Sequence, residues 1–124
     1  MSDLVRYTQL SNQDNIVENV TQTINKLSIS GYTIVEVDNK YLNSKKPYKA
    51  VHIQAISTNG QSFEIQFHTP ESYDIKLKNH ILYQEARKPG ITKERKKELM
   101  QQMKNNSYVL TTPKDIAKLT SWSN

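Results

Sequence analysis

The sequence predicts one α+β domain: a mixed sheet of four or five strands, two main helices on one face of it, and a further C-terminal helix. Segments in which apolar and polar residues alternate, as in half-buried strands, are interspersed with segments in which apolar residues recur at helical spacing. A length of 124 residues allows one core and leaves no room for a second domain. The polar face of the sheet is expected to form a cleft.

The first part of the chain predicts a strand, a helix and a second strand. Residues 4–10 form a short strand, and the polar cluster 11–14 suits the start of a helix. Apolar residues then recur through a helix over 12–30, and Gly31 stands where a left-handed residue would end it. Residues 32–38 are rich in β-branched side chains and alternate, which predicts the second strand.

The next two strands, 48–57 and 62–69, form a hairpin around Asn59 and Gly60, a strong turn signal. A two-residue turn would mix polar and apolar side chains on both faces. A three-residue loop, 58–60, with Gly60 in the left-handed position of a bulge, places apolar side chains opposite one another. This register pairs Phe63 with Ala55, Ile65 with Ile53 and Phe67 with Val51, and it gathers on the other face His52, Gln54, Glu64, Gln66 and His68.

The remainder of the chain is predicted to be mainly helical. A helix over 70–88 begins at a proline and is ended by a Pro-Gly pair. Thr92 caps a further helix that ends near residue 105. We expect a domain of residues 1–110, followed by a C-terminal tail of residues 111–124.

The composition narrows the possible partners. The chain has no cysteine, so it has no disulfide partner and no thiolate zinc site. It has no apolar run that could span a membrane and no signal sequence, so we expect a cytoplasmic location and no membrane partner, with a secreted effector as the open alternative. A net charge of +5 favours an anionic partner such as a nucleotide or RNA. The lysine-rich run 93–98 is more simply a solvated helix face.

Three ordered blocks of the sequence resemble the core of the RelA/SpoT synthetase family. They are Tyr48-Lys49-Ala50-Val51-His52, Glu64-Ile65-Gln66-Phe67-His68-Thr69 and His80-Ile81-Leu82-Tyr83. Residues 3–8 and 64–72 are even more similar to the RelA/SpoT-like domains attached to phage head proteins and polymorphic toxins. The resemblance covers roughly residues 3–88 and implies the nucleotidyltransferase-like fold of that family.

The synthetases of this family move a pyrophosphoryl group from ATP to the 3′-hydroxyl of a guanine nucleotide. Some toxin relatives act on adenine nucleotides or on the 3′ end of tRNA. The resemblance therefore implies a pyrophosphate or nucleotidyl transferase domain that acts on a purine nucleotide or an RNA 3′-hydroxyl with Mg²⁺. The alternative is a degenerate, non-catalytic module of a phage- or toxin-associated protein that binds a nucleotide, RNA or a protein.

The resemblance also assigns roles to individual residues. Glu64 would be the general base, or a metal-linked carboxylate, at the attacking hydroxyl, and Asp3 would be a second magnesium ligand. The catalytic set would include His52 and Gln66, which contact the acceptor or a phosphate. Tyr48 would stack on the acceptor base. Substrate binding would further involve Lys45, Lys46, Lys49 and His68, with His80 and Tyr83 as supports behind the site.

The chain departs from the family pattern at three places. His68 stands where the synthetases have an arginine, which removes a permanent bidentate cation, and a protonated imidazole could replace it only in part. Lys46-Pro47 replaces the Asn-Gly before the stacking tyrosine. The family also holds ATP on a basic helical segment before the first strand, and this chain begins only two residues before Asp3. The donor half is therefore expected to belong to a longer parent protein or to be absent.

Overall fold

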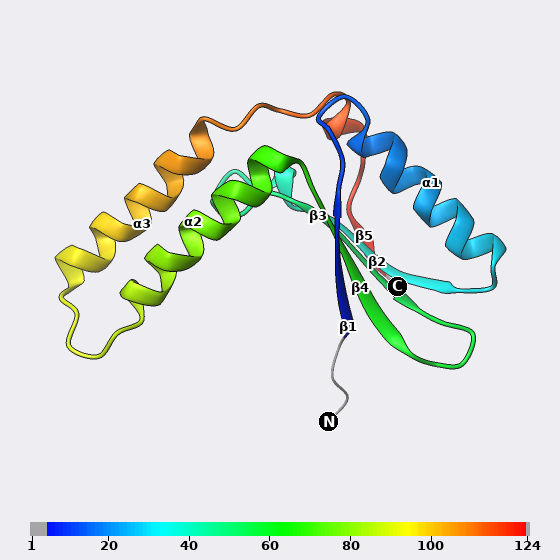
Figure 1. Ribbon diagram of the computed structural model, residues 1–124, viewed down its shortest axis with the longest axis horizontal. Helices are drawn as coiled ribbons and strands as arrows, with labels where there is room; N and C mark the ends of the chain where they lie inside the picture. Colours follow the sequence, from blue (N-terminus) through cyan, green and yellow to red (C-terminus); the bar gives the residue numbers. More distant parts are fainter. Residues whose placement is uncertain (1–4, 124) are drawn as a thin grey trace.

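The computed structural model describes residues 5–123, which form a five-stranded sheet flanked by helices (Figure 1). The strand order is β1-β4-β3-β2-β5, with β1 parallel to β4 and every other pair antiparallel. This confirms the predicted α+β class and mixed sheet. The elements are β1 (Val5–Leu10), α1 (Ile16–Ile29), β2 (Thr33–Asn39), β3 (Val51–Ile56), β4 (Ser62–His68), α2 (Pro70–Ala86), α3 (Lys93–Tyr108) and β5 (Trp122–Ser123), with short 3₁₀ turns η1 (Lys40–Leu42) and η2 (Ile116–Lys118).

The β3–β4 hairpin has the register that the alternation predicts. Ala55 pairs with Phe63, and the same register continues to Val51 and Phe67. The backbone N–H of Gly60 donates to the carbonyl of Ser57 and Gly60 has a φ of +87°, so the loop needs a residue that tolerates the left-handed region. The polar side chains of both strands therefore share one face of the sheet.

The hydrophobic core lies between α1 and the apolar face of the sheet. Ile16 and Val20 of α1 are fully buried, as are Ile53 and Phe67 of the hairpin. Such burial stabilises a domain by roughly 1.5–3 kcal/mol for each large aliphatic or aromatic side chain. This packing fixes the hairpin with its polar face turned away from α1.

Helix α2 does not lie on the same face as α1, which corrects the prediction of two helices on one face. The Lys76 ammonium of α2 donates to the Gln66 side chain on the polar face, while α1 packs on the opposite face. In Figure 1, α2 and α3 form an arm on one side of the sheet and α1 lies on the other. The apolar residues of α2 are spread around the helix, so its sequence shows no single face that must pack on the sheet.

The C-terminal segment packs against the sheet through Asn39, a buried residue at the end of β2. The Asn39 side-chain amide donates to the carbonyls of Ile116 and Leu119, and its backbone N–H donates to the Ser121 hydroxyl. Trp122 of β5 then pairs with Val37 of β2. The sequence did not predict β5 as a strand. The domain boundary at residue 110 stays a prediction. None of the helices in residues 5–123 has the length and apolar character needed to cross a membrane.

Candidate functional site

The polar face of the β3–β4 hairpin brings Glu64, Gln66 and His52 together, as the register predicts. The Gln66 side-chain N–H donates to Glu64 Oε1 over 2.8 Å, and His52 Nδ1 lies 3.5 Å from the same oxygen. Arg6 of the neighbouring strand β1 pairs with Glu64 and has its Nε 3.7 Å from Oε1. Both Glu64 and His52 are only slightly exposed at their side chains. The Glu64 carboxylate is therefore held by three polar neighbours at the centre of this face.

Tyr48 links this group to a second histidine. Its hydroxyl oxygen lies 2.8 Å from His52 Nε2 and 3.1 Å from His68 Nε2, and its ring meets both imidazoles edge to face. On the far side of His68, Nδ1 lies 3.0 Å from the Ser72 hydroxyl oxygen. A continuous chain of hydrogen-bonding groups therefore runs from α2 to Glu64.

The proton positions along this chain follow from its acidic end. A carboxylate only accepts, so His52 must turn a protonated Nδ1 toward Glu64, which leaves its Nε2 to accept the Tyr48 O–H. The Tyr48 oxygen then accepts from His68 Nε2, which leaves His68 Nδ1 as an acceptor facing the Ser72 hydroxyl, whose hydrogen is shared with the Thr69 carbonyl. The donors of the two histidines and of Tyr48 therefore point toward Glu64.

The start of α2 explains why His68 is buried. Thr69 and Ser72 form a capping box, in which each side-chain oxygen accepts the other residue's backbone N–H at 3.0 Å, and Pro70 occupies the first helical turn. The helix therefore begins directly after His68, which is 0% exposed. Tyr73 closes over its imidazole with the ring centres 5.7 Å apart. The structure thus places His68 behind Tyr48, away from the solvent side of the face.

Burial shifts the acid–base properties of this network. It lowers the pKa of His68 to about 4, with smaller contributions from the nearby Lys76 and His52. Burial likewise lowers the pKa of His52 to about 4, although the Glu64 carboxylate opposes this shift. Burial, followed by the Glu64 charge, raises the pKa of Tyr48. Both histidines and the tyrosine are therefore neutral at pH 7, consistent with the hydrogen-bond directions above.

The buried His68 predicts that acid destabilises the fold. Its pKa is lower in the folded chain than the ordinary 6.5, so the folded state is favoured above about pH 6.5 and loses this advantage as the pH falls toward 4. A shift of this size corresponds to at most about 3 kcal/mol. We expect urea unfolding curves to show a free energy of unfolding that falls between pH 7 and pH 4.5. A constant value across this range would contradict a buried, neutral His68.

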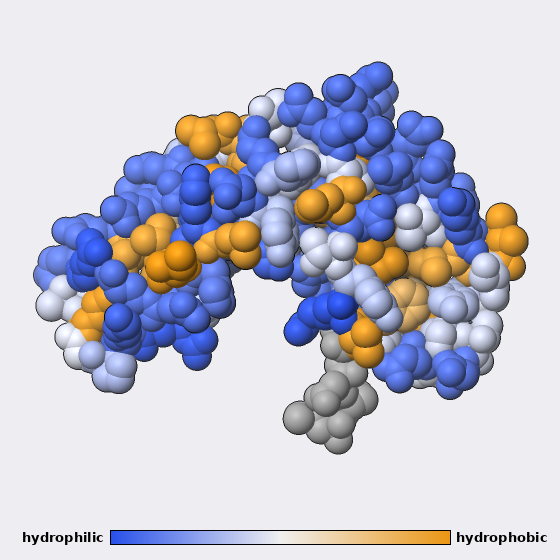
Figure 2. Space-filling model, in the orientation of Figure 1, coloured by the Kyte–Doolittle hydropathy of each residue, from blue (hydrophilic) through white to orange (hydrophobic). Residues whose placement is uncertain are grey.

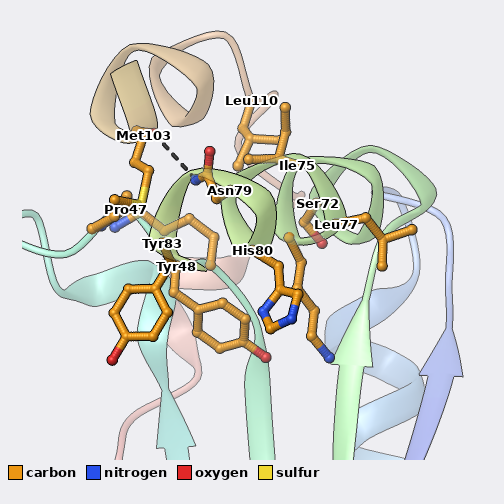
Figure 3. A pocket seen from close by; sticks show the side chains of 12 residues that line it. Pro47, Tyr48, Ser72, Ile75, Leu77, Asn79, His80, Tyr83, Met103 and Leu110 are labelled. Carbon is orange, nitrogen blue, oxygen red and sulfur yellow. Dashed lines mark hydrogen bonds between the residues drawn. The ribbon is translucent and has the colours of Figure 1, made fainter. Parts of the chain in front are cut away.

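A cavity of about 440 Å³ opens beside the network, between α2, the end of α3 and the segment before β3 (Figure 3). Tyr48 forms part of its wall, and His80 and Tyr83 of α2 face it. The rest of the wall is largely apolar and includes Ile75 and Met103. Both His80 and Tyr83 are exposed, and within the described residues their side chains form no hydrogen bond, so their predicted role as supports stays a prediction.

The three candidate lysines do not converge on Glu64. Lys49 lines the cavity, but its ammonium donates to the backbone carbonyls of Asn43 and Lys46, and burial lowers its pKa. Lys45 and Lys46 are exposed on the loop before Tyr48. Their assignment to phosphate binding stays a prediction. Asp3, the candidate metal ligand, lies outside the described residues.

The sequence pattern alone does not indicate three residues of the site: Arg6, Ser72 and Lys76. Lys76 places an ammonium 3.2 Å from the Gln66 side-chain oxygen, and Arg6 brings a guanidinium to Glu64. A signal for Ser72 was available, because a Thr three residues before a Ser at a predicted helix start is typical of a cap. Arg6 and Lys76 lie far from Glu64 in sequence, and only the sheet order and the direction of α2 bring them near it.

The fit of a magnesium ion depends on Glu64. Among residues 5–123, no group of three acidic or histidine side chains is arranged to hold a metal ion. Mg²⁺ at phosphoryl-transfer sites is commonly bound by only one or two carboxylates together with the substrate phosphates. Glu64 fits that pattern because its carboxylate lies on the polar face and only its Oε1 is engaged by the neighbours described above.

Comparisons with known proteins add a fold relationship. No protein-family model matches the sequence, and no curated protein is recognisably similar to it. Among solved structures, the small alarmone synthetase 2 from Bacillus subtilis matches with a TM-score of 0.57 at 17% identity, over 82% of this chain and 57% of that protein. The chain has the fold of the small alarmone synthetases.

Two further structures agree with this fold. The small alarmone synthetase 1 from Bacillus subtilis, bound to its product pppGpp, matches with a TM-score of 0.54 at 17% identity, over 84% of this chain and 54% of that protein. A GTP pyrophosphokinase family protein from Streptococcus pneumoniae matches with a TM-score of 0.55 at 18% identity, over 82% and 52%. The chain thus spans little more than half the length of these small alarmone synthetase-like proteins.

Proposed function

We propose that this domain is a RelA/SpoT-like pyrophosphate or nucleotidyl transferase domain that acts on a purine nucleotide or an RNA 3′-hydroxyl. The observation that carries the proposal is the position of the Glu64 carboxylate, held by His52, Gln66 and Arg6 on the polar face of a small alarmone synthetase fold. The cavity next to Tyr48 has the size and the apolar walls that suit a planar base.

The proposed reaction gives each polar group a task. Glu64 accepts the proton of the acceptor hydroxyl, whose oxygen forms a bond to the β-phosphorus of ATP while the bond from that phosphorus to the α-phosphate oxygen breaks and AMP leaves. Lys76 and Arg6 supply positive charge near the transferred oxygens. Mg²⁺, when bound, would neutralise phosphate charge, and Glu64 is the described residue that would hold it.

A transfer assay tests this proposal. The protein in its full-length form is incubated with Mg²⁺, either a guanine nucleotide, an adenine nucleotide or tRNA, and ATP labelled on the γ-phosphate to follow pyrophosphate transfer or, in parallel, on the α-phosphate to follow nucleotidyl transfer. We expect the label to appear on one of these acceptors. The absence of a labelled product with all three acceptors, from a protein shown to be folded, would overturn the proposal.

The second candidate is a non-catalytic module that binds a nucleotide, RNA or a protein. The burial of His68 favours it, since the residue at the position of the family's arginine faces the Tyr48 hydroxyl and not solvent. The hydrogen bonds of Lys49 to backbone carbonyls also favour the non-catalytic module, because they engage an ammonium group that phosphate binding would use. Calorimetric binding of a purine nucleotide without any transfer product would support this candidate over the enzyme.

A further inference from the structure

One face of α2 carries a polar stripe that continues the site away from the sheet. The stripe consists of Ser72, Lys76, His80, Tyr83 and Arg87, which follow one another at intervals of four, four, three and four residues. Residues at this spacing lie on the same side of a helix. Arg87 is the C-terminal cap of α2, so the stripe runs the whole length of the helix.

Contacts at both ends show where the stripe points. At its start, Ser72 touches His68, and the Lys76 ammonium lies 3.2 Å from Gln66 Oε1. In its middle, His80 and Tyr83 face the cavity beside Tyr48 (Figure 3). At its end, the Arg87 guanidinium lies 5.5 Å from the centre of the Tyr83 ring, which is 49% exposed. The stripe therefore forms one track with the polar face and leads outward from it.

The positive charge of the protein is concentrated in the segment before β3 and in the arm that carries this track. The segment 43–49 and the arm 70–108 hold 12 of the 17 Lys and Arg and five of the 12 Asp and Glu, a net charge of +7. The remainder of the chain has a net charge of −2. Figure 2 shows the arm and the sheet as the two sides of a concave surface. A polyanion is thus attracted to the arm more than to the sheet.

We propose that the α2 stripe binds single-stranded RNA, whose 3′-terminal nucleotide lies in the cavity and whose preceding nucleotides follow the helix. This inference rests on the proposed function, because it names RNA as the acceptor of the same site. From Ser72 to Arg87 the stripe extends over about 22 Å, which exceeds the length that one nucleotide needs. Cations alternating with an exposed aromatic ring are typical of sites where bases stack and phosphates are held.

Single-stranded RNA fits the stripe better than duplex RNA does. A duplex presents its phosphates and 2′-hydroxyls but keeps its bases stacked inside, so its bases could not reach the Tyr83 ring or the cavity. Unpaired bases can be splayed out and stacked on an aromatic side chain. The cation–π contact holds the Tyr83 ring beside the Arg87 guanidinium, which offers a stacking surface next to a phosphate ligand.

The experiment measures fluorescence anisotropy of a 12-nucleotide single-stranded RNA, labelled at its 5′ end, against the full chain. We expect Tyr83→Ala to weaken binding by about 5- to 100-fold, the effect of losing one stacked base. Arg87→Ala is expected to weaken binding and to lower the slope of log affinity against log salt by about 0.7, as expected for one lost phosphate contact. The duplex of the same sequence is expected to compete poorly.

Two exposed residues of α3 provide matched controls. Tyr108→Ala removes an exposed tyrosine and Lys97→Ala removes an exposed cation, both outside the stripe. We expect each control to change the affinity by less than about twofold. Circular dichroism of all four variants checks that α2 and α3 remain folded.

The outcomes separate this inference from the proposed function. Equal losses in the stripe variants and in the α3 controls, or equal affinity for duplex and single strand, would show non-specific charge attraction and overturn the inference. Transfer to a free nucleotide by a protein without affinity for the RNA would overturn this inference and leave the proposed function in place. Specific RNA binding without a transfer product would support the RNA track and contradict the proposed enzyme.

Discussion

Replacement of His68 by arginine, the residue of the synthetases at this position, is expected to destabilise the protein by about 3–5 kcal/mol. The His68 side chain is fully buried between the Tyr48 hydroxyl and the Ser72 hydroxyl, and neither partner can neutralise a guanidinium. Burying an uncompensated charge is among the costliest single changes in a protein. Because a domain of this size is stable by about 5–15 kcal/mol, urea unfolding should show a much lower midpoint or no folded baseline.

Thr8→Arg provides the control for this substitution. Thr8 lies on the exposed strand β1, where it pairs with Gln66 on the same sheet, so an arginine there can reach water. We expect it to change the free energy of unfolding by no more than about 0.5 kcal/mol. A His68→Arg variant as stable as the Thr8→Arg variant would mean that residue 68 can turn to solvent and that its burial is not required by the fold.

The hairpin was predictable because its alternation admits only one register. A shift of one residue would have exposed Phe63 and Phe67 and buried Glu64, so the apolar face alone determines the pairing. The positive φ of Gly60 then follows from the three-residue loop. The convergence of Glu64, Gln66 and His52 was therefore available from the sequence, since it is the other face of the same register.

The direction of α2 was not predictable by the same reasoning. Its apolar residues do not gather on one side, so periodicity does not say which face meets the sheet. The helix is anchored by the capping box of Thr69 and Ser72 and packs on α3, where Leu99 and Met103 are buried. This tertiary arrangement buries His68, which a strand pattern alone places on an open polar face. The position of Lys76 beside Gln66 depends on it as well.

Replacement of Glu64 by glutamine is expected to reduce the transfer reaction by at least about 100-fold if the domain is the proposed enzyme. The amide keeps the shape of the side chain but cannot take the proton of the acceptor hydroxyl, and general-base catalysis contributes about 10²- to 10⁴-fold. The fold should be little affected, because the Arg6 pair is at the surface and the Gln66 hydrogen bond can be accepted by the amide oxygen. Initial rates with the labelled ATP measure the effect.

Glu36→Gln is the matched control, because Glu36 lies on β2, two strands away from Glu64 on β4, and pairs with Gln54 of β3, which in turn pairs with Glu64. It removes one negative charge from the same sheet while leaving the Glu64 carboxylate and its partners in place, so we expect a rate within about twofold of the original. Equal losses of transfer rate in both variants would mean that the negative charge of the sheet as a whole, and not a base at residue 64, supports the reaction. Equal product from Glu64→Gln and the unchanged protein would remove Glu64 from the reaction, leaving the carboxylate as the acceptor that orients His52, Tyr48 and His68.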